Sequence, residues 1–327
     1  MKVIHLVMSK SFGGLELHVD ELFEAQKTSI TPILICNKEI AHRFSSNKQI
    51  HAIDNFNRFS FTNIYRLAKK IHKINPDIIH THGSKTTTII NIIKWFLPYK
   101  HIATIHGNKS NLSPYERADH VIGVNKHFLT SIKAPHTAIG NWWKPSLPKT
   151  FTKKPQYALA VGRLEKVKGF DILIKAWQGI NHKLVIIGCG QEKQSLLSLI
   201  QEHQLEDKIR ILPSMSSESL IKHFQEASVF ILSSLREGTP RVVLEALYLQ
   251  TPVLSTHVGA VPELLPKKYI APTENIKALH QLIKKHITQP ESLDQTDAFE
   301  RVQEHYSLKK KCQETLEVYQ SVIQEPV

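Results

Sequence analysis

The chain has 327 residues, of which 41% are hydrophobic and 22% charged, so it is neither disordered, collagen-like nor a small disulfide-bonded protein. Its length suits two domains of about 100–200 residues each. The formal net charge of +13 lies mostly in the first half, because residues 1–150 hold 20 Lys and Arg against 9 Asp and Glu. This imbalance favours an anionic partner, such as nucleic acid, a phosphorylated substrate or a membrane surface, over solubility alone.

Three cysteines, Cys36, Cys189 and Cys312, lie far apart without a CxxC pair, so we expect reduced thiols and a cytoplasmic protein. The first residues lack the apolar stretch and cleavage site of a secretory signal peptide. The most apolar segment, Ile89–Tyr99, is interrupted by Lys94 and is shorter than the ~20 residues that a membrane-spanning helix needs. We therefore expect a soluble chain.

Short apolar runs alternate with amphipathic segments in the first half. The expected strands are residues 2–8, 32–36, 77–80, 101–105 and 120–124. The expected helices cover residues 15–27 and 60–74. In the second helix, apolar residues recur every three or four positions, and basic residues fill the other positions: Arg66, Lys69, Lys70 and Lys73.

The second half repeats this alternation. Its expected strands are residues 157–161, 183–187, 208–212, 229–232 and 252–255, and its expected helices are 170–178, 191–203, 217–227 and 240–249. Near-continuous apolar strands separated by helices predict, in each half, a parallel sheet covered on both faces. Residues 141–155 contain three prolines and predict a linker, while residues 308–323 predict one more helix.

The segment Ser233–Ala246 directly follows an expected strand, where parallel α/β sheets bind ligands. Thr239 is the expected N-cap of the next helix and Pro240 its first residue, so free backbone N–H groups would face an anion. Glu237 lies on the loop and Glu245 within the helix, so the two carboxylates can reach different parts of one ligand. The alternative is an ordinary capped helix with exposed acids.

A second loop, Val161–Phe170, follows the first expected strand of the second half and carries Arg163 and Lys168. Arg supplies a forked donor and Lys a mobile point charge, which together suit a diphosphate. Taken alone, two such cations are more often solvated surface residues.

Together these loops resemble the retaining nucleotide-sugar glycosyltransferases of the GT-B fold, and specifically family 4 of the glycosyltransferases. The resemblance covers almost the whole chain, through motifs at Gly13-Gly14, Pro76–Gly83, Thr104–Gly107, Val161–Phe170, Ile186–Gly190, Glu237–Glu245, Thr251–Glu263 and Tyr306-Ser-Leu. It implies an α/β chain with two Rossmann-like domains facing across a cleft. The expected domains are an acceptor domain (1–145), a nucleotide-sugar domain (146–305) and a helix (306–327) that crosses back to the first domain.

The resemblance also implies roles for individual residues. His106 and Glu237 correspond to catalytic positions, with His106 near the transferred sugar and Glu237 binding its hydroxyls as the first glutamate of an E-x7-E motif. The donor would otherwise be held by Gly13, Gly14, Arg163, Lys168, Gly238, Thr239, Pro240, Arg241, Val242 and Glu245. Among these, Arg163 and Lys168 look like the clamp on the diphosphate, and Glu245 is similar to the glutamate that holds the ribose.

We expect no cofactor and no metal. The stretch Gly188-x-Gly190 lacks the third glycine of a dinucleotide fingerprint, and the chain contains no Asp-x-Asp motif for a metal-bridged diphosphate. His80 and His82 lie two positions apart and so share one face of a strand, but we expect no third ligand in register and therefore packing in the core or the cleft. Residues 188–191 and 212–214, which by the resemblance would flank the nucleotide base, depart from the family pattern. A UDP-sugar is nonetheless the favoured donor.

The expected reaction is metal-independent transfer of a hexose or related sugar, with retention, to a glycan or glycolipid, as in lipopolysaccharide or surface polysaccharide synthesis. Arg66, Lys69, Lys70 and Lys73 would form an acceptor or membrane surface on the cytoplasmic face of the inner membrane. One alternative is a nucleotide-sugar 2-epimerase of the same fold. The other is a nucleic-acid binder, but interleaved aromatics are expected to be absent from the basic helix, so no nucleic acid is expected.

Overall fold

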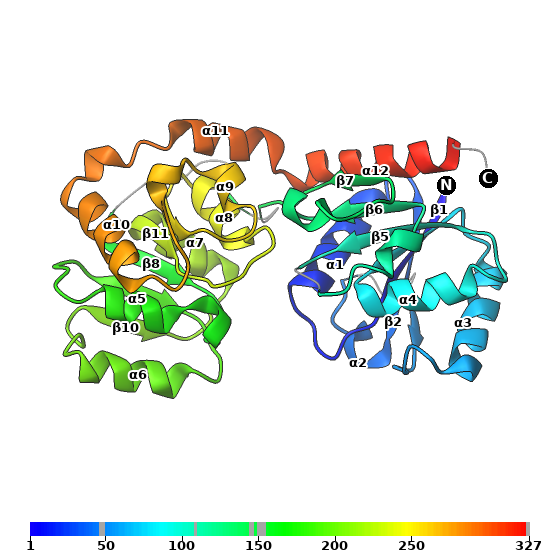
Figure 1. Cartoon of the computed structure of the whole chain (residues 1–327), viewed down its shortest axis with the longest axis horizontal. Helices are drawn as coiled ribbons and strands as arrows, with labels where there is room; N and C mark the ends of the chain where they lie inside the picture. The colour runs from blue at the N-terminus through cyan, green and yellow to red at the C-terminus, as the bar shows by residue number, and fades with distance from the viewer. Residues whose placement is uncertain (46–49, 108–109, 144–146, 149–154, 325–327) are drawn as a thin grey trace. The chain divides into compact units, whose positions relative to one another are not determined.

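The computed structural model describes residues 1–45, 50–107, 110–143, 147–148 and 155–324. They form two units, the first composed of Met1–Asn141 with Leu308–Val327 and the second of Trp142–Ser307. Each unit is a Rossmann-like domain with one parallel sheet and covering helices (Figure 1). The junction expected between residues 145 and 146 lies outside the described residues.

The sheet of unit 1 has the strand order β3-β2-β1-β4-β5-β6-β7, and all neighbouring strands are parallel. The order reverses between β1 and β4, the point at which open α/β sheets hold ligands. The strands are β1 (Lys2–Val7), β2 (Thr31–Asn37), β3 (Ile50–Ile53), β4 (Ile78–His82), β5 (Lys100–Ile105), β6 (His120–Gly123) and β7 (His136–Ala138).

Helices connect these strands, as parallel pairing requires. They are α1 (Gly14–Gln26), α2 (Lys38–Ala41), α3 (Phe61–Ile74) and α4 (Ser84–Ile93), with the short 3-10 helices η1 (Tyr115–Arg117) and η2 (Lys126–Leu129). The amphipathic pattern predicted for α3 is confirmed, because Ile64, Leu67 and Ile71 are buried. The helix ends at Asn75, whose left-handed backbone (φ 50°) stops the helical repeat.

Unit 2 repeats the arrangement with the strand order β10-β9-β8-β11-β12-β13, again all parallel. Successive residues of β8 point to opposite faces: Ala158 and Ala160 join one apolar cluster, and Tyr157 and Leu159 join the other. Both faces are therefore buried, as the apolar strands predict. The strands are β8 (Tyr157–Val161), β9 (Leu184–Ile187), β10 (Ile209–Leu212), β11 (Ala227–Leu232), β12 (Val253–Thr256) and β13 (Ile270–Ala271).

The helices of unit 2 pack on these two faces. They are η3 (Lys166–Lys168), α5 (Phe170–Ala176), α6 (Lys193–Glu202), α7 (Ser217–Glu226), α8 (Arg241–Tyr248), α9 (Val261–Leu264), η4 (Lys267–Tyr269), α10 (Ile276–Thr288), η5 (Pro290–Ser292) and α11 (Thr296–His305). No helix among the described residues is long and apolar enough to cross a bilayer.

The last helix, α12 (Leu308–Gln324), belongs to unit 1 although it follows unit 2 in sequence (Figure 1). It contacts α1, and Tyr319 is fully buried there. The Tyr319 hydroxyl lies 2.6 Å from Nδ1 of His80 on β4. A polar side chain thus joins the end of the chain to the middle of the first sheet.

Candidate functional site

Two of the predicted donor-binding loops meet at the switch point of the second sheet. The loop after β8 carries Arg163 and Lys168, and the loop after β11 carries Glu237. β8 and β11 are adjacent parallel strands, so their carboxyl ends lie at the same edge. The structure thereby brings together residues that are about 70 positions apart in sequence.

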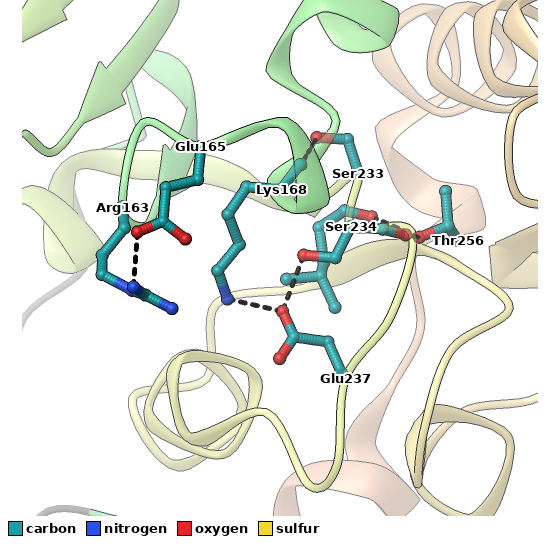
Figure 2. A network of polar contacts seen from close by, with 8 residues as sticks. Arg163, Glu165, Lys168, Ser233, Ser234, Glu237 and Thr256 are labelled. Carbon is teal, nitrogen blue, oxygen red and sulfur yellow. Dashed lines mark hydrogen bonds and ion pairs between the residues drawn. The ribbon is translucent and has the colours of Figure 1, made fainter. Parts of the chain in front are cut away.

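Lys168 and Glu237 form an ion pair at this edge. The Lys168 Nζ lies 2.7 Å from Oε1 of Glu237, and Ser234 Oγ donates to the same oxygen at 2.7 Å. Figure 2 shows both groups directed at the Glu237 carboxylate. The two charged side chains are only 19% and 13% exposed, so the pair is largely shielded from water.

Three hydroxyl residues that the sequence analysis missed hold this loop in place. Ser233 Oγ donates to the carbonyl oxygen of Lys168 (2.9 Å), and Thr256 Oγ1 donates to that of Ser234 (2.6 Å; Figure 2). Ser234 itself contacts Glu237. All three occupy strand ends or the positions just after them, and that location is the signal that could have identified them.

Glycines allow the loops to approach this closely. At Gly169 a Cβ would overlap the carbonyl oxygen of Ser233, and at Gly259 it would overlap that of Gly238. Both glycines also have a positive φ, at +61° and +51°. The backbone N–H of Ala260 donates to the Gly238 carbonyl at 2.8 Å. The conformation of the loop that bears Glu237 is therefore fixed by backbone packing.

Arg163 lies on the same loop as Lys168 but points to a different partner. Its guanidinium pairs with the Glu165 carboxylate and its side chain is 70% exposed (Figure 2). The exposed guanidinium can change partner on ligand binding with little loss of packing, because exposed ion pairs contribute little to stability.

The segment that follows Glu237 leads into α8. Pro240 is the N-cap, with ψ of 109°, and Arg241 is the first helical residue, so the prediction of Thr239 as the cap is wrong by one position. The reason is that the extended backbone at Pro240 lies outside the helix, while its carbonyl accepts the first helical hydrogen bond from Leu244. Glu245 is buried in the helix.

The side chains at the start of α8 have different surroundings. The Arg241 guanidinium lies 5.9 Å from the centroid of the Trp142 ring, and Val242 packs against the apolar core. Gly238 contacts Ala260 through its backbone, and Thr239 is buried. Backbone groups and the half-buried Arg241 side chain are thus the polar groups that the described helix start offers to a ligand.

Gly13 and Gly14 lie where β1 leads into α1, at the switch point of the first sheet. The N–H of Gly13 donates to Oε2 of Glu16 at 2.8 Å. A Cβ at Gly14 would meet no atom within 4 Å, and neither glycine has a positive φ. The fold of unit 1 thus gives no reason for glycine at position 14, whereas a ligand backed against the loop would.

His106 follows β5 and lies at the end of a buried group of histidines. Its Nε2 is 3.1 Å from Nδ1 of His82, and the ring of His18 on α1 meets its ring edge to face at 4.7 Å. His82 in turn contacts His5 on β1, and His80 lies beside both.

The expectation that His80 and His82 have no third ligand in register is wrong. The pairing of β1 with β4 sets His5 opposite His80, and ligand nitrogens of His5, His80 and His82 lie within 4.8 Å of one another. However, both ring nitrogens of each histidine already have hydrogen-bond partners. The described residues therefore form a hydrogen-bonded network here, and no set of lone pairs converges on a cation.

Burial keeps this network uncharged at neutral pH. Desolvation lowers the pKa of His5 to about 4, against a smaller opposing effect of its hydrogen bond to Gln26. Desolvation, followed by the neighbouring histidines, holds the pKa values of His80 and His82 well below the ordinary value. Each of these rings thus carries one proton and one lone pair.

The basic residues predicted as an acceptor or membrane surface lie on α3. Arg66, Lys69 and Lys73 are exposed, and Lys70 is half-buried. The prediction that aromatic residues are absent from this helix is wrong, because Phe61 and Tyr65 are 78% and 62% exposed on it. Phe61 belongs to the apolar stripe predicted for this helix, but the buried members of that stripe are Ile64, Leu67 and Ile71.

A groove of about 830 Å³ lies between α3 and the end of α4. Apolar atoms dominate its lining, and Trp95 and Phe96 on its far side are both 79% exposed. A contiguous exposed apolar patch is the kind of surface on which proteins bind partners, ligands or membranes. The groove is lined by Phe61, Ile64, Tyr65, Ala68, Lys69, His72, Ile92, Ile93, Trp95, Phe96 and Leu97.

Two Rossmann-like domains, each with a parallel sheet and polar loops at its switch point, are the architecture of the GT-B class of enzymes. Family comparisons name the class more closely. Residues 12–143 match the family model "Glycosyltransferase Family 4", and residues 146–302 match "Glycosyl transferases group 1". Successive parts of the chain thus match two family models of glycosyltransferases, and its fold is that of the GT-B class.

Curated relatives agree with this assignment. An uncharacterized glycosyltransferase of Haemophilus influenzae is 30% identical over 196 residues, which are 57% of this chain and 53% of that protein. The amylovoran biosynthesis glycosyltransferase AmsD of Erwinia amylovora is 32% identical over 108 residues, or 32% of this chain and 30% of that one. These matches span about half, or less, of the relatives' own length.

Solved structures match over nearly the whole chain. A glycosyltransferase from Rickettsia africae has a TM-score of 0.84 at 18% identity, covering 99% of both chains. Anabaena HepE in complex with UDP and glucose has a TM-score of 0.83 at 17% identity, covering 98% of this chain and 100% of its own. The lipopolysaccharide outer core galactosyltransferase WaaB has a TM-score of 0.82 at 17% identity, covering 98% and 99%. At these identities the likeness concerns the fold.

Proposed function

We propose that the protein transfers a hexose or related sugar from a nucleotide-diphosphate sugar to a glycan or lipid-linked acceptor, with retention of anomeric configuration and without a metal. The observation that carries this proposal is the Lys168–Glu237 pair at the switch point of the second sheet. A cation suited to a diphosphate here lies beside a carboxylate suited to sugar hydroxyls, which supports the roles that the E-x7-E resemblance implies. A UDP-sugar is the favoured donor, and HepE binds UDP and glucose on the same fold.

The chemical demand of this reaction is stabilisation of the leaving group. Cleavage of the anomeric bond develops negative charge on the diphosphate, which Lys168, Arg163 and the N-terminus of α8 would neutralise in a preorganised site. The pairing of Lys168 with Glu237 and of Arg163 with Glu165 holds both cations near the loop before the donor binds. The acceptor then attacks on the leaving-group face, and the donor phosphate takes its proton.

The remaining residues have supporting roles in this proposal. Glu237 binds hydroxyls of the transferred sugar, Glu245 holds the ribose, and Gly14 admits the diphosphate close to the backbone. His106 is assigned, from the family resemblance, to the histidine that acts near the transferred sugar. Metal independence is proposed because the sequence contains no Asp-x-Asp motif and because the three clustered histidines already satisfy one another and their neighbours.

A donor screen tests the proposal directly. The protein is incubated with UDP-, GDP- and ADP-sugars, and release of the nucleotide is followed with and without EDTA, while NMR records the anomer of the sugar product. We expect one donor class to be cleaved with retention in EDTA. Loss of activity in EDTA with rescue by manganese, an inverted product, or a 2-epimer of the donor sugar would each contradict the proposal.

The acceptor side is proposed to be an anionic membrane surface carrying a glycolipid. Exposed aromatics (Phe61, Tyr65, Trp95, Phe96) border the groove between α3 and α4, and exposed cations lie on the same helix. Aromatic side chains suit the interfacial region of a bilayer and cations suit anionic headgroups. Lys69 brings the two kinds together, because it lines the groove with its Nζ 5.0 Å from the centroid of the Tyr65 ring. Relatives that act in amylovoran and lipopolysaccharide synthesis, AmsD and WaaB, favour surface polysaccharide as the product class.

A further inference from the structure

A continuous chain of hydrogen bonds runs from the end of α1 to His106. Oε1 of Gln26 lies 2.8 Å from Nε2 of His5, Nδ1 of His5 lies 3.1 Å from Nε2 of His82, and Nδ1 of His82 lies 3.1 Å from Nε2 of His106. His5 and His82 therefore each use both ring nitrogens, and this relay of hydrogen bonds ends at Nε2 of His106. Apart from His106, which is half-buried, every member is buried.

The fold brings these residues together by strand register. β1 and β4 are parallel with His5 opposite His80, so His5, His80 and His82 project from the same face of the sheet. The rings of His5 and His82 stack at 5.3 Å with 17° between their planes. Gln26 is the last residue of α1 and is fully buried above them.

The direction of the relay follows from its first member. A neutral imidazole donates from one nitrogen and accepts at the other, so one fixed end determines every ring that follows. The Gln26 carbonyl oxygen faces His5, and its amide nitrogen faces the Tyr319 hydroxyl at 3.4 Å. His5 must then donate from Nε2 and accept at Nδ1, which places the proton of His82 on Nε2.

The second branch of the network is consistent with this orientation of Gln26. The Tyr319 hydroxyl accepts from the Gln26 amide and donates to Nδ1 of His80 at 2.6 Å. The remaining proton of His80 lies on Nε2, which donates to Thr104 Oγ1 at 2.6 Å. Thus α12, through Tyr319, holds the amide that orients the relay.

We propose that Gln26, His5 and His82 are positioning residues that hold His106 with a proton on Nε2 and with its ring in a fixed orientation. Neutral His106 then carries its lone pair on Nδ1. Edge-to-face contact with His18 restrains the same ring from the other side. The inference rests on the proposed function only where it assigns His106 to the transferred sugar; the protonation state itself can be measured separately.

The variant Gln26→Glu tests the relay by reversing it. A carboxylate at position 26 favours the charged form of His5, whose Nδ1 then donates to His82. His82 must accept at Nε2 and donate from Nδ1, so His106 receives a hydrogen bond at Nε2 and moves its proton to Nδ1. The measurement is the pair of ring ¹⁵N chemical shifts of His106 in labelled protein, which distinguish a protonated from an unprotonated nitrogen.

The matched control is Gln178→Glu. Gln178 is an exposed residue of unit 2 whose Nε2 lies 2.9 Å from Nδ1 of His203, so it repeats the glutamine–histidine contact outside the relay. We expect this variant to leave the His106 shifts unchanged. In Gln26→Glu we also expect kcat to fall about tenfold to a hundredfold at unchanged KM for the donor, as for lost partners that orient functional histidines.

A folded Gln26→Glu protein in which the His106 nitrogens keep their wild-type shifts would overturn the relay. If that variant does not fold, Gln26→Met removes the fixed acceptor without adding charge and should give His106 shifts averaged between the two tautomers; unchanged shifts would again overturn it. His106→Ala is assayed in parallel. Full activity in that variant contradicts the role of His106 in sugar transfer, while the tautomer result stands independently.

Discussion

At the scale of single residues, a bound diphosphate would replace Glu237 as the partner of Lys168. Two largely shielded charges compensate each other, and Ser234 supplies the carboxylate with a further donor. Removing one partner leaves the other charge shielded from water without its counterion. A diphosphate offers Lys168 a stronger anion, so the donor would release Glu237 toward sugar hydroxyls.

The first prediction concerns this pair. Lys168→Ala and Glu237→Ala should each lower kcat by about 10²–10³-fold, because each removes one preorganised charge from the site. Lys166→Ala is the control, since Lys166 is exposed on the same loop and the ion pair of Glu237 is formed by Lys168 instead. Circular dichroism should show all three variants folded. Near-normal turnover of either site variant would contradict the assigned roles.

The second prediction separates glycines needed by a ligand from glycines needed by the fold. Gly14→Ala should fold with an unchanged Tm and bind the donor at least tenfold more weakly, because its Cβ meets only open space in the chain itself. Gly259→Ala should lower Tm, because its Cβ would overlap the Gly238 carbonyl and its φ is +51°. Calorimetry of both proteins measures the two effects. Unchanged donor affinity in Gly14→Ala would remove position 14 from the donor site.

At the scale of elements, α3 and the end of α4 act together as one surface. The third prediction is that vesicles with anionic lipid bind the protein in co-sedimentation, that salt weakens the binding, and that Trp95→Ser with Phe96→Ser abolishes most of it. Both residues are exposed, so the double variant should keep its stability. Leu197→Ser on α6 is the control. It removes an exposed apolar side chain outside this surface, so vesicle binding should not change. Binding that ignores lipid charge and salt would exclude this surface as the docking face.

Most elements could be predicted from the sequence because their patterns are strong. The buried strands of both sheets read as apolar runs, and α3 has a clear helical period; β8 was predicted with its observed bounds, Tyr157–Val161. The strands β3, β7 and β13 were missed. β7 is His-Thr-Ala and β13 has two residues, so neither edge strand carries an apolar run, and only pairing with a neighbour defines them.

The site residues could be predicted where a short motif identifies them. Their contacts could not be predicted, because those depend on which strands and helices pack together. Lys168 and Glu237 could be named from the loops that bear them, but their contact depends on β8 lying next to β11. The histidine relay depends in the same way on the register of β1 with β4 and on α12, which arrives more than 200 residues after His80. No local spacing in the sequence contains that information.

At the scale of the whole molecule, the buried histidines make stability depend on pH. Desolvation lowers the pKa of His5 to about 4 and that of His101 to about 3, while the unfolded chain titrates near 6.5. Between these values the unfolded state binds more protons than the folded state. The contribution of the neutral, buried His5 and His101 to the free energy of unfolding is therefore complete above pH 6.5 and is lost as pH falls toward 4.

The fourth prediction follows from that sign. The free energy of unfolding of unit 1 should fall below pH 6.5, by about 1.4 kcal/mol per pH unit for each proton taken up on unfolding. His5→Gln should reduce this slope by about one proton. Amide hydrogen exchange in β1 and β4, corrected for its intrinsic pH dependence, reports the unit-1 stability separately from unit 2. An equal slope in the variant, or no slope in the wild type, would contradict the buried neutral state of His5.

The return of α12 to unit 1 also has a consequence for biosynthesis. Residues 142–307 are in effect an insertion within unit 1, so the ribosome completes the second domain before it makes Tyr319. Until then the nascent first domain lacks the helix that covers α1, and His80 lacks its phenol. During synthesis, unit 1 should therefore become protease-resistant after unit 2, although most of unit 1 is synthesised first.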